Sequence, residues 1–87
     1  MAASISVLTE DQAETDDLWP KLLENGGAES RCGWLVDRFG VSWQIIPKAL
    51  PRMMDADDKD AAMRARKAIM KMAKIDIFEL EIAFSRK

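Results

Sequence analysis

Histidine is missing from this sequence, and its absence removes several kinds of catalytic site. A Ser-His-Asp or Cys-His relay cannot be built within one chain without it. Metal sites that depend on histidine, including the type with two histidines and one carboxylate, are excluded as well. Any metal site would have to use carboxylates, amides, carbonyls and the single thiol, Cys32.

Cysteine, excess positive charge and long apolar runs are also scarce. One cysteine cannot form an internal disulfide, so nothing indicates an oxidising compartment. The 13 basic and 15 acidic residues leave no basic excess for nucleic acid or an acidic membrane surface. No apolar run approaches the roughly 20 residues that span a bilayer, and the N-terminus has no signal-peptide pattern. We therefore expect a cytoplasmic protein of bacterial type that binds neither nucleic acid nor membranes.

The first quarter of the chain predicts a strand followed by a helix. Residues 3–8 alternate between apolar and polar side chains, which is typical of a half-buried strand. Thr9 and Gln12 have the spacing of a capping box and predict the start of a helix. Pro20 removes a backbone donor, so we expect the helix to bend there. The helix is expected to end at residues 25–27, Asn-Gly-Gly.

Three further strands and a set of helices complete the pattern. The predicted strands are residues 28–32, 33–37 and 41–46, with a chain reversal at residues 37–40 whose geometry Asp37 satisfies. The predicted helices are a short one near residues 50–54, a long amphipathic one from Asp58 to Lys74 and a short terminal one. The basic residues of the long helix are expected to form a solvated face: Arg64, Arg66, Lys67, Lys71 and Lys74. The expected fold is α+β, with one βαβββ module in residues 1–47 and a C-terminal helical extension of the same domain in residues 48–87.

A known family shares much of this sequence. Residues 18–47, LWPKLLENGGAESRCGWLVDRFGVSWQIIP, resemble the C-terminal half of PhnB-like, or demethylubiquinone methyltransferase-like, proteins of the glyoxalase/bleomycin-resistance (vicinal oxygen chelate) superfamily. Residues 70–77 resemble the C-terminal segment of that family. The resemblance implies a βαβββ module, and a typical member carries two such modules in one chain. Because the superfamily's binding cavity forms where two modules pair, one module cannot build it alone.

The apolar strand residues lead to the same expectation. One helix can cover only one face of a four-stranded sheet. We expect Trp34, Val36, Trp43 and Ile45 to form a contiguous apolar patch on the other face, too large to stay exposed. The hypothesis is a homodimer whose two modules complete a cupped sheet across a two-fold axis.

The candidate site residues are Trp34, Val36, Trp43, Gln44, Ile45 and Cys32, as ligand-binding or interface residues. The resemblance implies that Gln44 stands where metal-dependent relatives carry a glutamate, and an amide is a poor ligand for a divalent cation. We therefore expect no metal and no cofactor. A buried, inert thiol is favoured for Cys32 over a nucleophile.

Three hypotheses for function remain open. The first is a dimeric, non-catalytic module that binds a small apolar or aromatic molecule in a cleft shared between subunits. The second is an enzyme without a metal, an isomerase or group transferase, with its active site at the dimer interface. The third is a structural partner of a separately encoded N-terminal half. Methyl transfer is not expected, because no glycine-rich loop follows a strand and opens a helix.

Overall fold

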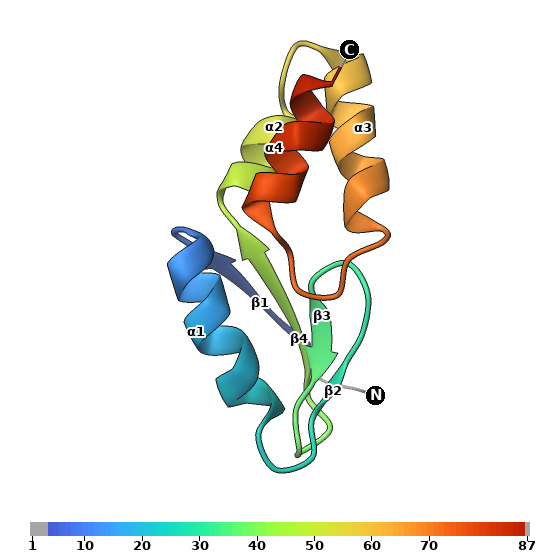
Figure 1. Ribbon diagram of the computed structural model, residues 1–87. Helices are drawn as coiled ribbons and strands as arrows, with labels where there is room; N and C mark the ends of the chain where they lie inside the picture. The colour runs from blue at the N-terminus through green and yellow to red at the C-terminus, as the bar shows by residue number, and fades with distance from the viewer. Residues whose placement is uncertain (1–3, 87) are drawn as a thin grey trace.

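The computed structural model describes residues 4–86, which form a four-stranded mixed sheet and four helices (Figure 1). The elements are β1 (Ser4–Thr9), α1 (Gln12–Leu23), β2 (Ala28–Glu29), β3 (Trp34–Val36), β4 (Ser42–Pro47), α2 (Ala49–Met54), α3 (Lys59–Ile69) and α4 (Ile77–Ser85). This confirms the α+β class and the βαβββ order followed by helices. Residue 3 of the predicted first strand, and residues 1, 2 and 87, lie outside the described residues.

The strand order in the sheet is β1-β4-β3-β2, with β1 parallel to β4 and the other pairs antiparallel. Residues that pair directly across strands share a face of the sheet. One face carries Ile5, Val7, Leu35, Trp43 and Ile45. The opposite face carries Ser4, Ser6, Leu8, Trp34, Val36, Ser42, Gln44 and Ile46, and Ile46 packs against residues of the helices that follow β4.

Helix α1 covers the first of these faces and forms the core of the module. Trp19 of α1 packs with Leu35 and Ile45, and the latter two have no exposed surface. The indole Nε1 of Trp19 also donates a hydrogen bond to the Glu29 carboxylate at 2.6 Å, which ties the helix to the edge strand β2. Burial of these large apolar side chains makes this face the stable centre of the βαβββ unit.

The start of α1 differs from the prediction. Asp11, and not Thr9, is the N-cap residue, since its carboxylate accepts a hydrogen bond from the Glu14 amide at 2.9 Å. Thr9 instead ends β1, where its buried hydroxyl is hydrogen-bonded to that of Thr15 at 2.6 Å. The helix continues through Pro20 and ends at Leu23, as residues 25–27 predict.

The edge strand β2 is shorter than the predicted strand of residues 28–32. Cys32 and Gly33 have φ values of 59° and 81°, so the backbone leaves the extended conformation there. Their amides donate to the carbonyls of Met72 and Ala73, both at 2.8 Å, instead of continuing a strand ladder. A segment distant in the sequence therefore sets the end of the strand.

Helices α2, α3 and α4 enclose a second core beyond the end of β4 (Figure 1). Its buried members are Leu50, Ala65, Ile75 and Leu80. Asp58 caps α3 as predicted, and Asp76 caps the predicted terminal helix α4. The long helix was expected to reach Lys74, but α3 ends at Ile69, because the chain must turn to bury Ile75 and to meet Cys32 and Gly33.

Residues 70–76, here termed the linking segment, fasten the second core to the module. In addition to the bonds with Cys32 and Gly33, the Gln12 side chain donates to the Ile75 carbonyl at 3.1 Å and accepts from the Ile77 amide at 2.7 Å. Lys74, expected on a solvated helix face, lies in this segment and pairs with Asp16 at 2.7 Å.

Candidate functional site

The face of the sheet opposite α1 is the candidate site. The open face, as we name it, consists of Ser6, Leu8, Trp34, Val36, Ser42 and Gln44. Helix α1 lies on the other side of the sheet, and the remaining helices gather beyond the end of β4 (Figure 1). The side chains of the open face are half-buried or exposed, so a ligand or a second protein surface can reach them.

Trp34 and Gln44 form the centre of the open face. They pair across β3 and β4, and Gln44 also lies beside Ser6 of β1, so an indole, an amide and a hydroxyl form one row across three strands. The Gln44 amide takes part in none of the side-chain hydrogen bonds found among residues 4–86. This row offers a flat apolar surface for stacking together with a donor and an acceptor for a polar group.

The predicted apolar patch is wrong in its composition. Trp34 and Val36 share a face, and so do Trp43 and Ile45, but the two pairs lie on opposite sides of the sheet. Trp34 pairs with Gln44, whereas Trp43 pairs with Leu35. The apolar and polar side chains alternate within each strand as predicted, but the register between the two strands depends on the turn that joins them. Ile45 has no exposed surface and belongs to the core under α1.

Trp43 is a structural residue that packs under α1 and anchors the β3–β4 turn. Its indole Nε1 donates to Asp37 Oδ2 at 2.9 Å, while Asp37 Oδ1 accepts from the amides of Phe39 and Val41. The bond from Trp43 is the main reason that the pKa of Asp37 lies below its ordinary value; burial opposes this shift, and the two backbone bonds support it. The prediction that Asp37 satisfies the turn is confirmed.

Cys32 lies in the turn between β2 and β3, outside the strands that form the open face. It is a free cysteine, and it is half-buried instead of buried as expected. Its amide is fixed by the Met72 carbonyl. Its predicted role, inert or reactive, stays a prediction.

The described residues hold no group of three or more acidic or thiol side chains that could bind a metal ion. Gln44, at the position where the resemblance implies a glutamate in metal-dependent relatives, has only serine, tryptophan and aliphatic neighbours on the open face. These neighbours are not ligands that a divalent cation prefers.

Ser6, Ser42 and Leu8 were not among the predicted site residues. The alternation of residues 3–8 already places Ser6 opposite Val7, and that of residues 41–46 places Ser42 beside Gln44. This pattern, combined with the parallel pairing of β1 and β4, would have identified the two serines.

Comparison with protein families identifies the family of the βαβββ module. A family model described as 3-demethylubiquinone-9 3-methyltransferase matches residues 1–46, more than half of the chain. The chain belongs to this family. This demethylubiquinone methyltransferase-like family is part of the glyoxalase/bleomycin-resistance superfamily, as the resemblance implied. The match ends within β4, so the resemblance of residues 70–77 to the family's C-terminal segment stays a prediction. No curated protein matches the chain. None of the helices in residues 4–86 is long and apolar enough to cross a membrane.

Proposed function

We propose that the chain is a non-catalytic, glyoxalase-like binding module. Its ligand is a small, flat, largely apolar molecule that lies on the open face, in a cleft that a second copy of the chain closes. The observation that carries this proposal is the row formed by Trp34, Gln44 and Ser6 on a sheet face that α1 leaves uncovered.

The chemistry of the open face supports an apolar ligand with one polar group. Small-molecule sites are mostly apolar with a few polar groups that fix orientation. Trp34 supplies a large flat surface, and the Gln44 amide and the Ser6 hydroxyl can bind one carbonyl or hydroxyl of the ligand. None of the six side chains of the open face ionises near neutral pH, so the face itself supplies no general acid or base.

The need for a second module supports the homodimer. We propose that the chain corresponds to the C-terminal half of a family member in which two modules pair to form the cavity. A second copy, related by a two-fold axis, would supply the other module and remove Trp34, Val36 and Leu8 from water. Leu8 is 57% exposed in the single chain, which leaves apolar surface for such a contact.

The family description names a methyltransferase, and we propose no methyl transfer for this chain. The connection from β1 to α1 is Glu10-Asp11, and Asp11 is used as the helix cap. All four glycines lie elsewhere, at positions 26, 27, 33 and 40. A nucleotide-type cofactor site with a glycine-rich loop therefore has no place at this strand-to-helix junction.

Two measurements test the proposal. Size-exclusion chromatography with light scattering should give a dimer at micromolar concentration, and Trp34→Arg should give a monomer that remains folded by circular dichroism.

Neutral 2-naphthol should quench the tryptophan fluorescence of the native chain with a saturable curve, and Trp34→Leu should weaken binding about tenfold. The matched control is Phe39→Leu, because Phe39 is an aromatic residue 75% exposed in a turn outside the open face. A monomeric native chain, or 2-naphthol binding that Trp34→Leu leaves unchanged, overturns the proposal.

A further inference from the structure

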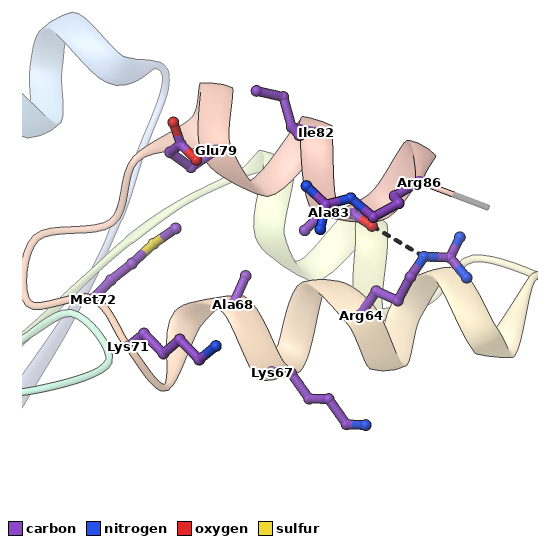
Figure 2. Close-up of a pocket in the computed structure, with 9 residues that line it drawn as sticks. All are labelled: Arg64, Lys67, Ala68, Lys71, Met72, Glu79, Ile82, Ala83 and Arg86. Carbon is purple, nitrogen blue, oxygen red and sulfur yellow. Dashed lines mark hydrogen bonds between the residues drawn. The ribbon is translucent and has the colours of Figure 1, made fainter.

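Helices α3 and α4 form a groove away from the strands of the open face. Figure 2 shows this groove in close-up. It has a volume of about 490 Å³ and is lined by Arg64, Lys67, Ala68, Lys71, Met72, Glu79, Ile82, Ala83 and Arg86. This helical groove lies within the size range of small-molecule sites.

The helical groove carries a concentrated positive charge. Four of its nine lining residues are basic, and Glu79 is the one acidic member, although the chain as a whole has a net charge of −2. Arg64 and Arg86 lie at one end of the groove, and Glu79 lies near Met72 at the other (Figure 2). Clustered cations of this kind raise the local concentration of anions.

Between the charges, the floor of the helical groove is apolar and shallow. Ala68 of α3 and Ala83 of α4 both line the groove, and their small side chains leave room for a ligand. Ile82 is 39% exposed at the rim, and Phe78, one helical turn earlier, is 68% exposed. Apolar surface left uncovered beside a polar rim is typical of a binding site.

Arg64 is already held in position for an anion. Its Nε and Nη2 atoms donate to the carbonyls of Ala83 and Phe84 at 3.0 and 2.8 Å, at the C-terminal end of α4 (Figure 2 shows the first bond). A guanidinium has five N–H donors, so three remain for a ligand. A fixed side chain loses little rotamer entropy on binding. Arg64, expected on a solvated helix face, is therefore a preorganised member of this groove.

We propose that the helical groove binds an amphipathic organic anion. Its carboxylate or phosphate head would lie near Arg64 and Arg86, and its apolar body would lie over Ala68 and Ala83 toward Met72. Arg64 and Ala68 are four positions apart in α3, a rise of about 6 Å, so a short alkyl body reaches from the head across the apolar floor toward Met72. Charge complementarity selects the head, and the apolar floor selects the tail.

A second copy of the chain fits the helical groove less well. One acidic segment is α1 with the residues before it, but its apolar side chains, including Trp19 and Leu22, already pack on the sheet. The other acidic segment, residues 55–60, has alanine as its only apolar residue. The outward face of either segment would meet the basic rim and leave the apolar floor of the groove unfilled.

Nuclear magnetic resonance titrations of the full chain test the proposal. The probes are octanoate and octyl phosphate, with octyltrimethylammonium and inorganic phosphate as controls for the tail and the head alone. We expect both amphipathic anions to shift the backbone amides of residues 64–72 and 79–86 with a saturable curve that weakens in added salt, and the two controls to bind at least tenfold more weakly. Equal binding of octyltrimethylammonium, or shifts confined to the open face, overturns the proposal.

A matched pair of charge reversals makes the test specific. Lys71→Glu should weaken octanoate binding about tenfold, whereas Arg66→Glu should leave it within about twofold. Both residues are exposed and the charge change is the same, but Arg66 does not line the helical groove. Equal weakening by the two variants overturns the proposal. The proposal is also overturned if the groove binds no probe and the chain self-associates through the groove in a way that Lys71→Glu abolishes. In that case a second copy of the chain would be the occupant.

Discussion

The carboxylate of Asp37 accepts a hydrogen bond from the indole Nε1 of Trp43 at 2.9 Å, and this contact joins the β3–β4 turn to strand β4. The same carboxylate closes the turn by accepting from the amides of Phe39 and Val41. One side chain thus fixes both the reversal of the chain and the side of the sheet on which Trp43 lies. The register that separates Trp43 from Trp34 depends on this turn.

Acid is expected to weaken the fold through Asp37. The bond from Trp43 lowers the pKa of this carboxyl below its ordinary value, and the hydrogen bond from Lys74 lowers the pKa of Asp16 in the same direction. A lowered pKa in the folded state stabilises the protein above the ordinary value, and that stability is lost as the pH falls through the lowered value. The urea midpoint should therefore fall below about pH 4. Asp37→Asn should reduce the dependence of the urea midpoint on pH and leave only the part that Asp16 contributes. Asp57→Asn, in an exposed loop, should not change the pH dependence of the midpoint.

The buried pair Thr9 and Thr15 should behave as a unit. Both hydroxyls are fully buried, and each has the other as its partner at 2.6 Å. Thr9→Val or Thr15→Val alone leaves one buried hydroxyl unpaired and should lower the free energy of unfolding by about 1–3 kcal/mol. The double variant should recover most of the loss, since valine has the same shape. Urea denaturation of all four proteins gives the coupling energy, and additive losses would contradict the expectation.

Gly33 and Gly40 provide a matched test of backbone contact. Their φ values are 81° and 83°, so alanine at either position carries a similar strain of about 1–2 kcal/mol. A Cβ at Gly33 would lie 2.8 Å from the Ile45 carbonyl oxygen, whereas a Cβ at Gly40 would meet nothing within 4 Å. Gly33→Ala should therefore destabilise the protein by at least about 1 kcal/mol more than Gly40→Ala. Equal melting temperatures would show that the contact is relieved by a backbone shift.

The stability of the protein should depend on the amide nitrogen of the Gln12 side chain. A glutamate at this position can still accept from the Ile77 amide, but it cannot donate to the Ile75 carbonyl and adds a charge beside Asp16. Gln12→Glu should cost about 1–2 kcal/mol of unfolding free energy and speed hydrogen exchange in α4. Ala13→Glu adds the same charge at an exposed neighbouring position and should change stability by less than about 0.5 kcal/mol. Equal losses would assign the effect to charge alone.

Local patterns in the sequence predicted much of the fold. Alternation located the strands, Asp58 marked the start of α3, and residues 25–27 marked the end of α1. The choice of Asp11 over Thr9 as the cap of α1 could not be made locally, because both residue types cap helices well. Thr9 was removed from that role by its pairing with Thr15, a contact within the packed interface of strand and helix.

The candidate site was harder to predict than the elements that form it. Trp34 and Gln44 were identified, but Trp43 and Ile45 were placed on the wrong side of the sheet, because strand register depends on a turn whose geometry the letters Asp-Arg-Phe-Gly do not determine. The linking segment and the helical groove had no signal in local periodicity. Both arise from backbone and side-chain bonds between residues far apart in the chain, such as those of Cys32 and Arg64.

The position of the linking segment has a consequence for synthesis of the protein on the ribosome. Gln12 is translated 63 and 65 residues before its two partners, Ile75 and Ile77. Until then the amides of Cys32 and Gly33 lack their acceptors, and the nascent sheet cannot take its final form. This fold is therefore completed only after residues 70–77 have left the ribosome, and a pause in translation before residue 70 would hold the sheet in an incompletely folded state.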